Sequence, residues 1–129
     1  MNRLCKKVSI SGNNISPYIL EAFSSSDTKQ KATLTRALFK GLNEGQYSCA
    51  LTCSLPDRPG RPTKPELLAP KHVSKRRIST GRKGRIALLH AIAHIELNAI
   101  DLALDMAGRY TAYGLPFDFV RDWLSVAND

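Results

Sequence analysis

The longest regular pattern of apolar and polar positions lies between Gly84 and Gly108. This stretch contains neither proline nor internal glycine and is rich in alanine and leucine, which favour helix. The pattern predicts one helix over residues 84–108, the longest element of the chain. On a helical wheel its polar side chains share a sector of roughly 80°; they are His90, His94, Asn98, Asp101 and Asp105.

Glu96 lies almost opposite this polar sector, among the apolar side chains of the same stretch. If that face is buried, the ionised carboxylate must be paired, hydrogen-bonded or bound to a metal, because unpaired burial is too costly. If the face is only half covered, Glu96 reaches an arginine such as Arg85 or solvent. The helix alone favours the second interpretation. In either case we expect Glu96 to face the helix after Pro116 or an open groove.

His90 and His94 are four residues apart on the same face, a spacing at which two histidines can share a metal ion. The zinc-protease pattern, however, places a glutamate directly after the first histidine, and Ala91 stands there. The alternative is a polar stripe in which the histidines bond Asn98 or Asp101 or face another segment. The sequence favours this alternative.

Two shorter helices are predicted before the central one. The first begins at Ser16 with a proline in its first turn and ends at the serines 24–26. The second runs from its N-cap Asp27 to about Leu42. Its buried face is predicted to carry Ala32, Leu34, Ala37, Leu38 and Phe39. Its solvent face is predicted to carry Lys29, Lys31, Arg36 and Lys40.

Residues 55–83 form a proline- and arginine-rich segment that holds five of the seven prolines. Prolines at this spacing exclude helix and central strand and favour extended chain. The segment is either a disordered linker or a strap laid over helices. Spaced apolar residues favour the strap: Leu67, Leu68, Val73 and Ile78. Residues 46–55, before it, fit a ragged strand or irregular chain equally well.

A last helix is predicted over residues 116–129, and it has neither glycine nor proline as a stop signal. Two long helices with broad apolar faces need more partners than the short helices supply. We therefore expect an all-α chain that is cut off inside a helical bundle.

The chain of 129 residues carries a net charge of +8, which resides between Asp57 and Arg85. A basic segment of this kind can hold RNA or DNA through phosphates. The candidate residues are Arg58, Arg61, Lys75, Arg76, Arg77, Arg82, Lys83 and Arg85. No aromatic residue for base stacking is interleaved with them. A solvated loop, whose arginines cap helix ends or pair with carboxylates in the missing half of the bundle, is therefore favoured over a nucleic-acid interface.

The three cysteines, Cys5, Cys49 and Cys53, are an odd number without a disulfide framework, which fits a reducing compartment. The N-terminus has no secretory signal pattern, and residues 1–14 show no periodicity. His90, His94 and Glu96 interrupt the most apolar run, which argues against a membrane span. We expect a cytoplasmic protein without a membrane partner.

Three stretches together resemble a bacterial ferritin-like family, catalogued as domain of unknown function 455. They are Asp57-Arg-Pro-Gly-Arg-Pro62, Gly84-Arg-Ile-Ala-Leu-Leu-His-Ala-Ile-Ala-His-Ile-Glu-Leu97 with Ala99-Ile-Asp-Leu-Ala103, and the closing Pro116-Phe117, Asp122-Trp-Leu124 and Val126-Ala127. The resemblance covers residues 27–129 and does not extend to the variable segment 1–26. It implies a four-helix bundle that holds two metal ions, iron or manganese, with a glutamate from each of two helices and a Glu-x-x-His from each of the other two.

In this resemblance Glu96 corresponds to the lone glutamate of the first metal-binding helix. His90, His94 and Asp101 point away from it, and we expect them to support the site or the fold rather than to touch metal. In the family the helix after Pro116 continues into Glu-Ala-Arg-His, just past the position of Asp129. The chain is therefore expected to be the N-terminal half of a truncated ferritin-like domain (residues 27–129).

Such domains are oxidoreductases, but this chain lacks most of the ligands. We expect it to be inactive and metal-free alone, with the missing C-terminal half or a second copy of itself as partner.

Overall fold

The computed structural model describes residues 13–48, 54–73, 79–113 and 115–129. The elements, in chain order, are β1 (Asn13–Asn14), α1 (Ser16–Ser24), α2 (Thr28–Asn43), β2 (Tyr47–Ser48), the 3-10 turn η1 (Pro70–His72), α3 (Arg82–Arg109), the 3-10 turn η2 (Tyr110–Tyr113) and α4 (Phe117–Asn128). Within the described residues the fold is helical apart from β1 and β2, a parallel pair of two residues each. The prediction of an all-α protein is confirmed.

The helix ends follow from local signals. Proline stands in the first turn of α1, and the Asp27 carboxylate caps α2 by accepting a hydrogen bond from the Gln30 N–H at 2.9 Å. The central helix α3 begins two residues earlier and ends one residue later than predicted. The stretch 46–55, for which the sequence left strand and irregular chain open, contains the short strand β2. Residues 49–53 of this stretch and residues 1–12 lie outside the described part of the chain, and these two segments include all three cysteines.

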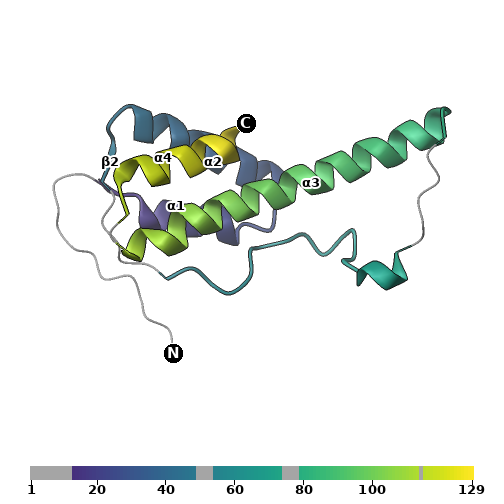
Figure 1. The fold of residues 1–129 in the computed structure, drawn as a ribbon, viewed down its shortest axis with the longest axis horizontal. Helices are drawn as coiled ribbons and strands as arrows, with labels where there is room; N and C mark the ends of the chain where they lie inside the picture. Colours follow the sequence, from purple (N-terminus) through teal and green to yellow (C-terminus); the bar gives the residue numbers. More distant parts are fainter. Residues whose placement is uncertain (1–12, 49–53, 74–78, 114) are drawn as a thin grey trace.

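The core lies where α1, α2 and α4 surround the C-terminal half of α3, and α3 and α4 run side by side in opposite directions (Figure 1). Buried side chains from every helix meet here: Ile15, Ile19, Ala22, Phe23, Leu38, Leu42, Leu55, Leu104, Ala107, Val120 and Leu124. Full burial of each large apolar side chain stabilises the fold by about 1.5–3 kcal/mol. The cluster therefore fixes one end of α3 within the bundle.

The N-terminal half of α3 extends beyond the other helices (Figure 1). Large apolar side chains stay in solvent there; Leu88 is 60% exposed, Leu89 66% and Ile95 61%. By length and composition alone α3 is apolar enough to cross a membrane, although His90, His94 and Glu96 lie within it. This is weak evidence for a membrane span, because core helices of soluble proteins have the same composition.

Three expectations about burial are wrong. Ala37, expected on the buried face of α2, is exposed. Lys31, expected on the solvent face of α2, is 1% exposed, because Thr35, Leu38 and Leu42 follow it at helical spacing and place it on the buried face. In the strap, the expected apolar anchors Leu67, Leu68 and Val73 are about half exposed, and Ile78 lies outside the described residues. The strap is held by other groups.

Candidate functional site

The polar sector of α3 is the surface on which the strap lies. At its centre is Asp101, which is 4% exposed and faces Lys31 of α2. The Lys31 ammonium donates to Asp101 Oδ1 at 2.5 Å, to the Gly60 carbonyl at 2.8 Å and to the Phe23 carbonyl at 3.3 Å. All three of its N–H donors are therefore used. Lys31 ties the end of α1, the strap and α3 together.

Arg61 of the strap supplies the second positive charge. Its Nη2 lies 2.6 Å from Asp101 Oδ2, in a close ionic contact without an aligned N–H. The same nitrogen donates a short hydrogen bond to the side-chain oxygen of Asn98. The cluster of Lys31, Arg61 and Asp101, hereafter the clip, carries two positive charges and one negative charge. Two cations therefore flank one buried carboxylate and orient it.

The chain next to Arg61 is fitted to this contact. The Gly60 N–H donates to the Phe23 carbonyl at 2.9 Å, and a Cβ on Gly60 would lie 2.1 Å from the Ser24 carbonyl oxygen. Only glycine allows the two backbones to approach so closely. Five residues earlier, Leu55 is buried in the core. The beginning of the strap is thus fixed by backbone fit and ion pairing.

A further contact joins the strap to the end of α3. Arg109 donates to Asp105 Oδ1 from both Nε and Nη2, at 2.9 and 2.6 Å, and to the Pro56 carbonyl at 2.9 Å. The hydrogen bond with Asp105 raises the pKa of the Arg109 guanidinium above its ordinary value, although burial acts in the opposite direction. The strap is therefore bound by polar side chains of α3 between Asn98 and Arg109.

His90 and His94 lie farther along the same sector and line one groove of about 330 Å³. Its other walls are Thr28, Ala93 and Leu97 from the helices and Pro62, Lys64 and Pro65 from the strap. Of the two interpretations of this pair, the structure shows the histidines facing another segment. Among the residues that the structure describes, neither a carboxylate nor a cysteine lines the groove with them.

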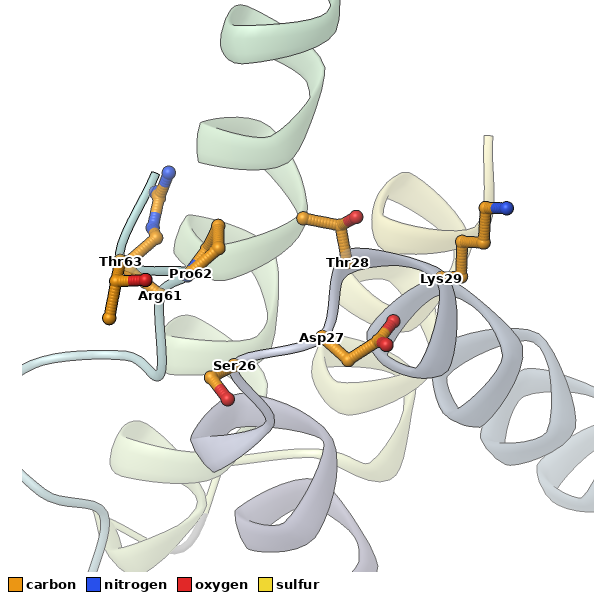
Figure 2. Close-up of a pocket in the computed structure, with 7 residues that line it drawn as sticks. All are labelled: Ser26, Asp27, Thr28, Lys29, Arg61, Pro62 and Thr63. Atoms are coloured by element: carbon orange, nitrogen blue, oxygen red, sulfur yellow. The ribbon is translucent and has the colours of Figure 1, made fainter. Parts of the chain in front are cut away.

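A larger hollow of about 580 Å³ lies between the strap and the start of α2 (Figure 2). Arg61, Pro62 and Thr63 form one side of it, and residues 26–29 form the other. The Asp27 carboxylate already occupies the N-terminus of α2 as its cap, and Arg61 is paired with Asp101. The two charged side chains that these contacts involve, Asp27 and Arg61, are therefore engaged in holding the fold.

Glu96 lies on a different side of α3, toward α4, as the helical wheel predicts. It is exposed and lines a pocket of about 160 Å³. The pocket is formed by Ala32 and Arg36 of α2, Glu96, Ala99 and Ile100 of α3, and residues 126–129 at the end of α4. Among the described residues Glu96 has neither a hydrogen bond nor an ion pair. It is therefore an available oxygen ligand beside a cationic side chain.

The residues at this pocket do not form a di-metal centre by themselves. Its acidic groups are Glu96 and Asp129, and the described chain contains no group of three or more His, Cys, Asp or Glu side chains that could hold a metal ion. A di-metal carboxylate site needs four carboxylates and two histidines. Glu96 is thus one ligand of such a site at most, and its role stays a prediction.

The basic residues predicted as a possible nucleic-acid interface differ in their surroundings. Arg61 is bound in the clip, while Arg58, Arg82, Lys83 and Arg85 are exposed. Lys75, Arg76 and Arg77 lie outside the described residues. For Arg61 the structure agrees with the alternative to a nucleic-acid interface, in which the arginines pair with carboxylates. Its partner Asp101, however, belongs to this chain and not to the missing half of the bundle.

Sequence reasoning missed the clip, although one signal for it was present. Lys31 shares its sector of the α2 wheel with Leu38 and Leu42, and a lysine on an apolar face requires a buried anion. The polar sector of α3 offers Asp101 as that anion.

Comparison with known proteins places this geometry in a family. Residues 24–129 match the family described as "Protein of unknown function (DUF455)". An uncharacterized protein of Haemophilus influenzae is 51% identical over 73 residues, which span 53% of this chain and 25% of the relative. The match therefore covers about a quarter of that relative's length. No solved structure matches the chain. Since the family match includes α2, the strap, α3 and α4, the chain belongs to the family of unknown function DUF455.

Proposed function

We propose that the chain is part of a ferritin-like di-metal carboxylate protein and that Glu96 is one of its metal ligands. The observation that carries the proposal is the position of Glu96. It is an exposed carboxylate without a partner among the described residues, on the side of α3 that faces the end of α4. A carboxylate kept free on an otherwise apolar sector is what a metal-binding helix requires.

The helix arrangement supports this proposal. The antiparallel pair α3 and α4 has the form of one half of a four-helix bundle. Leu89 lies seven residues before Glu96 on the same side of α3, is 66% exposed and is suited to packing against further helices. The remaining ligands would come from such helices. The clip and the two histidines would hold the strap on the opposite side of α3, away from the metals.

The metals, iron or manganese, would supply activation of dioxygen or oxidation of a substrate. The chain's own contribution is one oxygen ligand, held on a long helix whose other end is fixed in the core. A cytoplasmic location is part of the same proposal.

Metal analysis tests the proposal. The Haemophilus relative and this chain are purified in parallel, and iron and manganese are measured by plasma mass spectrometry. The relative is expected to hold about two metal ions per chain and this chain far less than one, since six protein ligands are needed. A relative that binds neither metal would refute the family function.

A second arm tests Glu96 itself. In a chimera in which this chain replaces the matching part of the relative, Glu96→Gln is expected to lower the metal content by half or more. Glu66→Gln removes an exposed carboxylate of the strap and is the matched control, with unchanged metal content. Equal metal content in both variants would remove Glu96 from the site.

A further inference from the structure

The side of α3 that faces away from the core carries a second apolar pattern. Leu88, Ile92, Ile95, Ala99 and Leu102 follow one another at alternating spacings of four and three residues. We call these five residues the outer stripe. Alternation of four and three is the heptad spacing by which one helix packs lengthwise against another. The stripe spans residues 88–102, and its first and last members lie about 21 Å apart along the helix axis.

Four of the five residues of the outer stripe are exposed in the described chain, and Ala99 lines the pocket at the end of α4. Leu88 is 60% exposed, Ile95 61%, Leu102 57% and Ile92 43%. Leu102 lies beside the packed half of α3, and yet it is as exposed as Leu88 at the free end. The bundle of α1, α2 and α4 therefore leaves this side of α3 exposed at both ends of the stripe, at Leu88 and at Leu102. An apolar stripe of this length on a helix marks an interaction surface.

Charge indicates what occupies this surface. The free end of α3 carries Arg82, Lys83 and Arg85, with no acidic residue in its first turn. The opposite end of the molecule holds the first turns of α4, where Asp118 and Asp122 outnumber Arg121 and their side chains are 69% and 72% exposed. One end of the molecule is thus basic and the other is acidic. Such a surface is complementary to a copy of itself turned end for end.

We propose that two copies of this chain associate through their outer stripes, with the two α3 helices antiparallel. A two-fold axis near Ile95 would place the basic end of each α3 beside the acidic end of its partner. In a parallel pair, by contrast, the two sets of three positive charges would lie together. The inference does not rest on the metal proposal, since Glu96 is not a member of the stripe.

Analytical ultracentrifugation of the full chain between about 1 and 100 µM tests the association. The wild-type chain is expected to be a dimer. Ile95→Glu should raise the dissociation constant by roughly a hundredfold or more, because each dimer then buries two carboxylates instead of two apolar side chains. Leu67→Glu is the matched control, since Leu67 is equally exposed but lies in the strap. Circular dichroism should show unchanged helix in both variants.

The orientation has its own test. The triple variant Arg82→Gln, Lys83→Gln and Arg85→Gln should weaken an antiparallel dimer severalfold, and added salt should weaken the wild-type dimer. A tighter dimer in this variant would mean a parallel pair and would overturn the proposed geometry. A wild-type chain that stays monomeric at 100 µM, or a dimer that Ile95→Glu leaves intact, would overturn the interface.

A lipid surface is the competing occupant of an exposed apolar helix. Sedimentation with phosphatidylcholine vesicles distinguishes it from a second copy. We expect no binding to the vesicles. Binding that Ile95→Glu abolishes and Leu67→Glu preserves would assign the outer stripe to a membrane and overturn the dimer.

Discussion

The two halves of α3 have similar compositions and opposite surroundings. From Asn98 to Arg109 the helix packs against α1, α2, α4 and the strap, and Ala103, Leu104 and Ala107 are fully buried. From Arg82 to Leu97, leucines and isoleucines are mostly exposed. Helix propensity alone does not distinguish the halves. The difference is made by contacts from outside the helix, of which the clip is the most specific.

Removing the carboxylate of the clip should have the largest effect on the packed half. Asp101→Ala leaves Lys31 buried without an anion, and we expect it to lower the free energy of unfolding by about 3–5 kcal/mol. Urea denaturation measures this. The control is Asp105→Ala, one turn away, whose partly exposed pair with Arg109 is worth up to about 1 kcal/mol. Equal effects of the two substitutions would show that the clip is not a special contact.

Substituting two leucines of α3 in turn compares the stability contributed by its packed side with that contributed by its exposed side. Leu104 is fully buried and Leu102 is 57% exposed, although they are two residues apart. We expect Leu104→Ala to cost about 2–5 kcal/mol and Leu102→Ala less than about 1 kcal/mol, at concentrations where the chain is monomeric. The helix propensity changes identically in both variants, so thermal unfolding reports only the difference in packing. A large loss in Leu102→Ala would show that the outer stripe is covered within one chain.

The sequence was sufficient to predict the helices, because their signals are local. Asp27 as N-cap, the proline-free stretch around Glu96 and the start near Pro116 each act within a few residues. The way the strap is held could not be predicted in the same way. Its anchors are Gly60 and Arg61, whose partners lie on α1, α2 and α3, far away in the sequence. Apolar spacing pointed to Leu67 and Leu68 instead, and these remain exposed.

The candidate site was predictable only as far as it depends on local sequence. The wheel separated Glu96 from His90 and His94 correctly, because periodicity alone decides which side of a helix a residue occupies. That Glu96 is exposed rather than buried depends on how far α4 and α2 reach along α3, and no local pattern contains that information.

The close approach of the strap to α1 should be sensitive to a single methyl group. In Gly60→Ala the new Cβ meets the Ser24 backbone, which has little freedom to move, and we expect a loss of about 1–3 kcal/mol. Gly81→Ala is the matched control at the free end of α3, where no atom lies within 4 Å of the new Cβ. Chemical denaturation should show a loss of no more than about 1 kcal/mol in the control, because alanine is a weaker N-cap than glycine but meets no steric contact. A neutral Gly60→Ala would mean that the strap moves aside easily.

The smallest effect is expected at Glu96. If this carboxylate were buried without a partner, as one interpretation of the helical wheel allows, Glu96→Leu would stabilise the chain by removing an uncompensated charge. In the structure Glu96 is exposed, so the substitution should change the free energy of unfolding by no more than about 0.5 kcal/mol. Urea denaturation of the monomeric chain, beside Glu66→Leu in the strap as a second exposed carboxylate, provides the comparison. A stabilisation well above that of the control would show that the bare half of α3 is covered in solution and that Glu96 lies beneath the cover.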